Sequence, residues 1–199
     1  MATKIASRVS TRERLLEAAN ELFYGEGVQT VGIDRVIERA GVAKASLYNT
    51  FRNKEGLVCA YLELRSERRK EQISRTLTRF RTPREQLLGV FDALGEVLTD
   101  PQFNGCPFAR ASAEMAADSA VRKVADTYRA WLRDLFTELA TGSGYADPET
   151  LARQLHQLYD GAEQSARMDR DPSAATTARA AATALLNAAP LLRAAPAGQ

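Results

Sequence analysis

Apolar residues recur at intervals of three and four along most of the chain, the spacing that gathers them on one face of an α-helix. Polar capping residues and glycines separate these runs, and no stretch alternates apolar and polar residues as a half-buried strand does. The pattern predicts nine helices and an all-α protein. The helices are expected to begin at or near Ser10, Thr30, Ala43, Asn53, Thr82, Phe108, Asp118 or Ser119, Asp147 and Asp171.

The second and third predicted helices are short and are separated by Gly41. In the third helix Leu47 and Phe51 are four residues apart, so both can pack against the first two helices. Its other positions would then point outward or sideways. They carry small, hydroxylated, amide or basic side chains, namely Lys44, Ala45, Ser46, Tyr48, Asn49 and Thr50. The pattern is that of a helix-turn-helix, although spacing alone fits three ordinary bundle helices equally well.

The outward residues of the third helix have the chemistry that contact with DNA requires. Serine and threonine bond to bases or phosphates, lysine donates to guanine, and alanine contacts the thymine methyl group. The hydroxyl of Tyr48 can reach a phosphate, and Lys54 adds a positive charge at the start of the fourth helix. The sequence therefore favours a DNA-binding surface here.

Charge is distributed unevenly between the two ends of the chain. The net charge of +2 over 199 residues divides into +4 for residues 1–70, with 13 basic and 9 acidic side chains, and −2 for the remainder. A basic N-terminal third suits an end that faces nucleic acid. The asymmetry is small and supports the helix-turn-helix reading without establishing it.

Residues 12–57 closely resemble the N-terminal domain of the TetR family of transcriptional regulators. The resemblance rests on RERLLEAANELFYGEGVQTVGIDRVIERAGVAKASLYNTFRNKEGL, and most specifically on AGVAKASLYNTFRNKEGL. It implies that the third helix enters the major groove, where Lys44, Ala45 and Ser46 read bases. The phosphate contacts that it implies are Thr30, Tyr48, Asn49 and Lys54. The chain departs from the family at Asn49-Thr50, where larger residues are frequent, so the role of Thr50 stays open.

The same resemblance implies a nine-helix, two-domain architecture. Residues 1–56 would form the helix-turn-helix domain, with a basic arm at 1–9, and residues 57–189 the ligand-binding and dimerisation domain. The Ala/Pro-rich residues 190–199 are expected to be a disordered tail. A homodimer would form through the last two long helices, of which the ninth is rich in alanine. High helix propensity alone also explains that alanine content.

The effector pocket is predicted from aromatic and sulfur-containing residues around the fifth-to-sixth connection and on the helices that should converge there. These candidates are Phe103, Cys106, Phe108, Met115, Tyr128, Trp131 and Tyr159. They suit a small, mostly apolar ligand held by one or two hydrogen bonds. Each of them is equally well explained as a core residue. The charged later part of the fourth helix is expected to be a solvated connector.

Three functions are compatible with the sequence. The first is a repressor that binds a palindromic double-stranded DNA operator and is released by a small-molecule effector. The second is a redox-responsive DNA-binding regulator that senses through Cys106, although a cysteine next to proline is as easily a buried filler. A small helical enzyme is remote, because the chain has one histidine, no HExxH, no GxSxG and no glycine-rich phosphate loop.

Other features exclude further classes of protein. Two cysteines without a CxxC or Cys/His cluster give no basis for a metal site or a disulfide framework, and no cofactor is expected. No apolar run approaches the ~18 residues of a membrane span. We therefore expect a cytoplasmic protein with no membrane partner.

Overall fold

The computed structural model describes residues 10–192, and in this range the chain forms nine α-helices. They are α1 (Thr11–Glu26), α2 (Ile33–Ala40), α3 (Lys44–Phe51), α4 (Lys54–Leu77), α5 (Pro83–Leu98), α6 (Pro107–Glu114), α7 (Ala120–Gly142), α8 (Pro148–Asp169) and α9 (Ala174–Ala188). The only extended pairing between described residues is an isolated bridge of Tyr145 with Leu191. The predicted all-α class is confirmed. The predicted arm at residues 1–9 lies outside the described residues.

Most helices begin where their capping residues predict. Ser10 and Thr82 form capping boxes with Glu13 and Glu85, in which each side chain bonds the other residue's backbone N–H. The side-chain oxygen of Asn53 accepts from the Gly56 N–H at 2.8 Å. The capping side chains thus satisfy N–H groups that the first helical turn leaves unpaired.

Two predicted helix starts are wrong. The N-cap of α2 is Gly32, without a side-chain cap, and Thr30 lies two residues earlier on the exposed surface. The N-cap of α9 is Ser173 rather than Asp171. Asp171 instead accepts hydrogen bonds from the backbone N–H and hydroxyl of Ser173. An Asp or Thr before a helix can bond within the preceding turn, so its presence does not fix where the helix begins.

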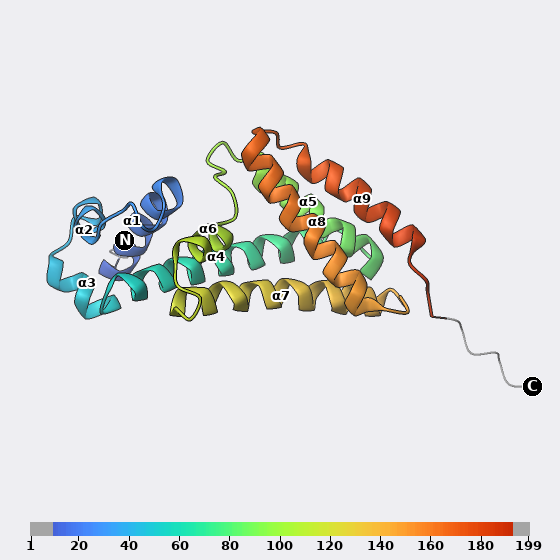
Figure 1. Ribbon diagram of the computed structural model, residues 1–199, viewed down its shortest axis with the longest axis horizontal. Helices are drawn as coiled ribbons and strands as arrows, with labels where there is room; N and C mark the ends of the chain where they lie inside the picture. The colour runs from blue at the N-terminus through green and yellow to red at the C-terminus, as the bar shows by residue number, and fades with distance from the viewer. Residues whose placement is uncertain (1–9, 193–199) are drawn as a thin grey trace, which may run out of the picture. The chain divides into compact units, whose positions relative to one another are not determined.

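The described residues divide into two compact units. One contains the described part of Met1–Arg65 together with Pro107–Ala125, and the other contains Ser66–Cys106 and the described part of Asp126–Gln199. The long helices α4 and α7 each contribute residues to both units. In Figure 1 the first unit contains α1, α2, α3 and α6, and the second contains α5, α8 and α9.

The first unit is held by apolar residues that its short helices share. Leu47 is fully buried and Phe51 nearly so, and α3 packs against both α1 and α2. Phe23 from α1 meets Tyr61 from α4 edge to face, with ring centroids 5.7 Å apart. The predicted inward orientation of Leu47 and Phe51 is confirmed. The opposite face of α3 is therefore exposed.

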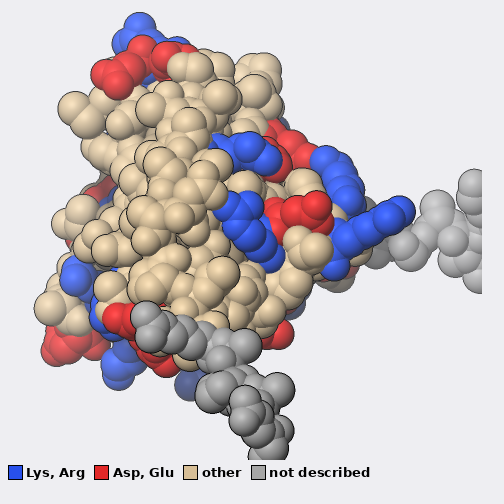
Figure 2. Space-filling model, turned by 90° about the vertical axis from the view of Figure 1, so that its right-hand side faces the viewer, with Lys and Arg blue, Asp and Glu red and all other residues tan. Residues whose placement is uncertain are grey.

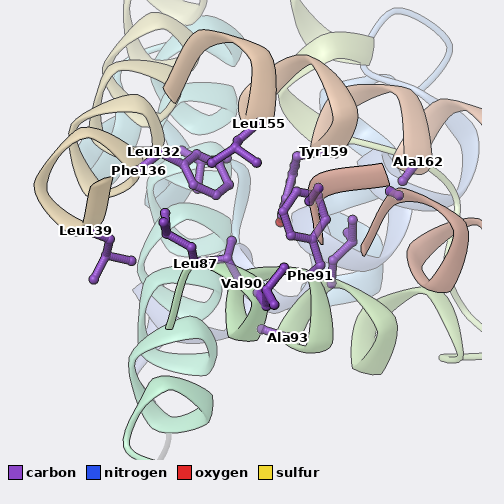
Figure 3. Close-up of a cluster of buried hydrophobic side chains, with 14 of the residues drawn as sticks. Leu87, Val90, Phe91, Ala93, Leu132, Phe136, Leu139, Leu155, Tyr159 and Ala162 are labelled. Atoms are coloured by element: carbon purple, nitrogen blue, oxygen red, sulfur yellow. The ribbon is translucent and has the colours of Figure 1, made fainter. Parts of the chain in front are cut away.

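The core of the second unit is built from α5, α7, α8 and α9. Phe91 from α5 packs against Phe136 from α7 and Tyr159 from α8, with ring centroids 6.0 and 6.4 Å apart (Figure 3). On α9 the buried positions are mostly alanine, which lets this helix lie close to α5 and α8.

The charged second half of α4 is not the solvated connector that its composition predicts. Ile73 and Thr76 are buried, and only 11% of the Arg69 side chain is exposed. Charged residues flank these positions. The high charge of the segment as a whole therefore does not show that one face of the helix is buried. That prediction is wrong for Arg69, which lies against α8.

The chain after α9 pairs with the loop that follows α7. The N–H of Ala146 donates to the carbonyl of Pro190 at 2.9 Å, and the N–H of Leu192 donates to that of Gly144 at 2.8 Å. The hydroxyl of Tyr145 also donates to the carbonyl of Leu186. These bonds order the first three residues of the segment expected to be disordered, and its residues 193–199 lie outside the described part of the chain.

Candidate DNA interface and regulatory body

The turn between α2 and α3 sets the angle at which α3 leaves the domain. Gly41 ends α2 in the left-handed conformation, with φ of 60°, and its N–H and that of Val42 bond back to the last turn of α2. Arg14 of α1 donates to the Gly41 carbonyl at 2.8 Å. A side chain at position 41 would meet the Arg14 guanidinium at 2.8 Å. The left-handed backbone is what favours glycine here, because the Arg14 guanidinium is the end of a flexible side chain that can move aside.

The structure exposes nearly all the residues predicted to contact DNA. Around α3 these are Lys44, Ala45, Tyr48, Asn49 and Thr50, and Thr30 is exposed before α2, whereas Ser46 and Lys54 are half-buried. Tyr48 is one of the few large hydrophobic residues exposed in the described chain. An aromatic ring with a terminal hydroxyl suits a surface that becomes covered by a polar partner.

The hydroxyl of Thr50 is engaged within its own helix. It donates to the carbonyl of Ser46 at 2.7 Å, one turn earlier in α3. The hydroxyl hydrogen is therefore used, and only the oxygen lone pairs remain available to an outside donor. This separates Thr50 from Asn49, whose amide side chain is exposed.

Both short helices begin without a side-chain cap. The N-caps of α2 and α3 are Gly32 and Ala43, and neither has a side-chain oxygen to accept from the first turn. Uncapped backbone N–H groups at a helix start attract phosphate oxygens, and the helix dipole strengthens the attraction. The sequence did not indicate this contribution, because backbone N–H groups are common to all residues and leave no mark in the pattern of side chains.

An acidic residue of α2 lies beside the first residue of α3. Lys44 Nζ donates to Oδ1 of Asp34 in the first turn of α2, at 2.9 Å. This hydrogen bond is the largest cause of the raised pKa of Lys44. The sequence did not predict this pairing, because Asp34 occupies a polar position of an ordinary amphipathic helix.

The residues predicted to line an effector pocket divide between the two units. Phe103, Cys106, Tyr128, Trp131 and Tyr159 belong to the second unit, whereas Phe108 and Met115 belong to the first. The rings of Tyr128 and Trp131 stack with centroids 6.0 Å apart, and the Tyr128 and Tyr159 hydroxyls share a hydrogen bond. Phe103 and Trp131 pack on the second unit's core. In the first unit, Phe108 is buried and Met115 accepts a hydrogen bond from the Gln29 amide.

A buried ion pair lies among the aromatic residues of the second unit. Arg69 donates to the hydroxyl of Tyr159 at 3.2 Å and to Oε1 of Glu163 at 3.3 Å. The side chains of Arg69 and Glu163 are only 11% and 4% exposed. Burial raises the pKa of Glu163, and Arg69 partly offsets that effect. The pair was not predicted, because both residues lie in segments that read as charged helix faces.

His156 is a second buried polar residue of this unit. Its Nε2 lies 3.5 Å from Oδ1 of Asp160, but it makes no hydrogen bond. Asp160 is occupied by Arg129, which donates to both carboxylate oxygens at 3.0 and 2.7 Å. Burial lowers the pKa of His156 to about 4, so the ring is neutral at pH 7.

Helix α6 is joined to the DNA-binding helices by specific hydrogen bonds. Arg110 donates to the carbonyl of Tyr24 in the last turns of α1, at 2.6 Å. Glu114 accepts from the backbone N–H of Gln29 at 2.7 Å, and the Gln29 amide returns a bond to the Glu114 carbonyl. These contacts place α6 in the same compact unit as the helix-turn-helix.

The groove between α8 and α9 is lined mainly by small uncharged residues, together with Asp169 and Asp171. On α9 the exposed positions Thr177, Ala181, Ala184 and Ala188 follow one another at helical spacing. Gly161 and Ser165 of α8 line, with α9, a groove of about 410 Å³. Figure 2 shows a broad area of uncharged residues on the side of the protein that carries α9, with charged side chains along its margins. Small uncharged residues over such an area permit close approach by another helix.

Two family models match the chain. Residues 15–61 match the model described as bacterial regulatory proteins, tetR family, and residues 83–182 match a tetracycline repressor-like C-terminal domain. The second match alone covers half of the chain. The protein belongs to the TetR family.

Solved structures of TetR regulators have the same fold over almost the whole chain. One from Streptomyces coelicolor is 31% identical with a TM-score of 0.84, over 89% of this chain and 94% of the other. Another, from Streptomyces avermitilis, is 34% identical with a TM-score of 0.80, over 92% and 100%. The nine-helix, two-part TetR architecture predicted from the sequence is confirmed.

Curated relatives match over shorter regions. The transcriptional activator FasR of Mycolicibacterium smegmatis is 41% identical over 56 residues, and the uncharacterized regulator YvkB of Bacillus subtilis is 33% identical over 66. These matches cover 28% and 33% of this chain. The chain spans only 26% of FasR and 35% of YvkB.

Membership of the TetR family identifies the protein as a DNA-binding transcriptional regulator rather than an enzyme. Within residues 10–192, no three His, Cys, Asp or Glu side chains are grouped as metal ligands would be. None of the helices in that range combines the length and apolar character that crossing a membrane requires.

Proposed function

We propose that this TetR regulator is a homodimeric repressor that binds a palindromic operator and is released by a small, mostly apolar effector. The observation that carries the proposal is the exposed outer face of α3, held outward by the burial of Leu47 and Phe51 on the opposite side. A helix presented in this way can enter a major groove without unfolding its support. We place its action in the cytoplasm, where a bacterial regulator meets the chromosome.

The base-reading residues of the proposal are Lys44, Ala45 and Ser46, in the first turn of α3. The contacts proposed to phosphates come from Thr30, Tyr48, Asn49 and Lys54, helped by the uncapped N-termini of α2 and α3. Thr50 is assigned a supporting role because its hydroxyl donates to Ser46. This division predicts that one set of residues determines sequence preference and the other determines overall affinity.

The proposed dimer forms through α8 and α9. One short recognition helix reads few bases, and two half-sites about one helical turn apart multiply the contact. The small uncharged residues that line most of the α8–α9 groove support this assignment, because charged side chains are depleted at the centres of stable interfaces. The exposed Met168 at the end of α8 adds apolar surface at the same face.

The proposed signal passes from the effector to the DNA-binding helices through α6. Two polar side chains of α6, Arg110 and Glu114, bond to the end of α1 and to the residues that follow it. Movement of α6 would therefore pull on α1, against which α3 packs. An effector can drive this change only if it binds the released conformation better than the DNA-bound one.

The proposed effector-contact residues are those of the second unit, namely Phe103, Cys106, Tyr128, Trp131 and Tyr159, whereas the other two candidates, Phe108 and Met115, belong to the first unit. Stacked rings with hydroxyl tips support a largely apolar ligand that makes one or two hydrogen bonds.

The relative FasR is named an activator, so repression rather than activation by this protein is part of the proposal. Reporter transcription from the bound promoter, with and without the regulator, distinguishes repression from activation.

The proposed DNA contacts are tested by Lys44→Ala and Lys54→Ala. We expect Lys44→Ala to lower the preference for operator over random DNA by about 5- to 150-fold, because a base contact is lost. We expect Lys54→Ala to weaken binding to all sequences alike and to reduce the salt slope by about one, because one phosphate contact is lost. Fluorescence anisotropy at several salt concentrations measures both. An unchanged preference for operator over random DNA in Lys44→Ala would show that the first turn of α3 does not read bases.

A second candidate keeps the DNA-binding domain but makes Cys106 a redox sensor. The half-buried thiol is hydrogen-bonded to Glu163, and the cations Arg69 and Arg129 lie in its electrostatic surroundings. Positive charge near a thiol favours the reactive thiolate, whereas the carboxylate opposes it. The two effects compete, and the candidate therefore ranks second.

Peroxide sensitivity of operator binding distinguishes this candidate. If Cys106 is the sensor, Cys106→Ser is expected to keep DNA binding after a peroxide treatment that abolishes it in the parent protein. Cys59→Ser is the matched control, since Cys59 is the other half-buried thiol and burial raises its pKa. Full peroxide sensitivity in Cys106→Ser would eliminate the redox candidate.

A further inference from the structure

Asp34 and Lys44 form a donor–acceptor pair at the surface that the proposed function assigns to DNA. The two residues come from the first turns of α2 and α3, and the ammonium nitrogen lies 2.9 Å from the carboxylate oxygen. Both side chains remain largely open to solvent, Lys44 at 60% and Asp34 at 81%. An exposed ion pair of this kind adds at most about 1 kcal/mol to stability, so folding alone gives little reason for it.

We infer that Asp34 is a specificity-determining residue that reads one base pair together with Lys44. The inference rests on the proposed function, which places Lys44 in the major groove. An ammonium group has three donors, and a carboxylate has about four acceptor positions. Each group can therefore keep its bond to the other and still bond to a base. The pair then offers DNA a donor beside an acceptor at fixed spacing.

This arrangement complements the major-groove edge of a base pair. A G·C pair presents the O6 acceptor of guanine beside the N4 amino donor of cytosine. Lys44 donates to the guanine oxygen, and Asp34 accepts from the cytosine amino group. Reversing the base pair brings the Lys44 ammonium against the cytosine amino donor and the Asp34 carboxylate against the guanine O6 acceptor. The two side chains therefore distinguish G·C from C·G.

Asp34 also penalises binding to unmatched DNA. Its negative charge faces a polyanion, and on a sequence without a suitable amino group it loses water without gaining a partner. Specificity arises as much from such costs against wrong sequences as from contacts with the right one. Asp34 is therefore expected to weaken random-sequence binding more than operator binding.

The inference is tested by Asp34→Asn in the full chain. Dissociation constants are measured for the operator selected by the parent protein, for that operator with single base-pair reversals, and for random duplex of equal length. We expect the operator-to-random affinity ratio to fall by about fivefold or more, because the neutral amide no longer disfavours unmatched DNA and offers cytosine a weaker acceptor beside an NH₂ group. The greatest loss of discrimination should come at one reversed G·C pair in each half-site.

Glu38→Gln is the matched control. Glu38 is an exposed acid one turn further along α2, and its replacement by glutamine removes the same charge as Asp34→Asn does. We expect it to change the ratio by less than about twofold, as a surface charge without a base contact should. An equal fall in both variants, or an unchanged ratio in Asp34→Asn, would overturn the inference. Circular dichroism of each variant confirms that the helices are retained.

Lys44→Ala separates this inference from the proposed function. If Lys44→Ala lowers the ratio and Asp34→Asn does not, the recognition surface stands and the role of Asp34 is rejected. If neither substitution changes the ratio, both the surface and the role of Asp34 are rejected. A fall in both variants, with the loss at the same base pair, supports the two together.

Discussion

Replacing Arg69 with methionine is expected to lower the free energy of unfolding by about 3–5 kcal/mol, the cost of leaving a buried charge without its partner. Glu163 is 4% exposed, and Arg69 is the one cation that bonds to it among the described hydrogen bonds. Methionine fills similar space but donates no hydrogen bond. Urea denaturation followed by circular dichroism measures the loss.

The loss in Arg69→Met should depend on pH with a defined sign. Burial already raises the pKa of Glu163, and removing Arg69 would raise it further. The folded variant then binds a proton that the unfolded chain, with its carboxyl group near 4.5, releases. The free energy of unfolding should therefore fall as the pH rises above that value, and the variant should be least impaired in mild acid.

Two further variants check this explanation. Arg69→Met combined with Glu163→Leu removes both charges and should recover most of the stability, because a buried ion pair can be exchanged for apolar residues at little cost. Arg68→Met alters the exposed neighbour and should change stability by less than about 0.5 kcal/mol. A double variant as unstable as the single one would show that the damage came from packing rather than charge.

Replacing Ala181 with glutamate is expected to convert the dimer to a monomer and to weaken operator binding by about 100-fold or more. Ala181 is exposed on α9 and lines the groove between α8 and α9. In the proposed dimer a carboxylate there would be buried against uncharged residues and, by symmetry, would lie near its own copy. Sedimentation and anisotropy measure the two effects.

Ala117→Glu is the control for this prediction, since Ala117 is exposed in the turn after α6 and gains the same charge. It should remain dimeric and bind the operator normally. If Ala181→Glu also stays dimeric, the interface lies elsewhere and the assignment of α8 and α9 fails. A monomeric variant with full operator affinity would instead contradict the requirement for paired half-sites.

The sequence predicts the elements that depend on local pattern. Leu47 and Phe51 lie inward because a spacing of four residues places them on one face, and the capping boxes at Ser10 and Thr82 form because their partners are three residues away. Each of these features is decided within about one helical turn. The proposed DNA contacts of α3 came from the resemblance of residues 12–57 to the TetR family.

Features that depend on which helices meet could not be read from local pattern. The buried pairing of Arg69 with Glu163 joins residues 94 positions apart, and the contact of Glu114 with Gln29 joins residues 85 apart. A run of charged residues in the sequence does not indicate which of them will be buried against another helix. The pairing of Lys44 with Asp34 depends on the angle between α2 and α3, which the turn at Gly41 determines.

Selection of bound sites from a random DNA pool by the full-length protein is the most direct test of the account. We predict enrichment of an inverted repeat whose half-sites are about one helical turn apart, with preference at one position of each half-site altered in Lys44→Ala. Enrichment of a single unpaired site, or of no sequence at all at physiological salt, would contradict a dimeric regulator that reads DNA through α3.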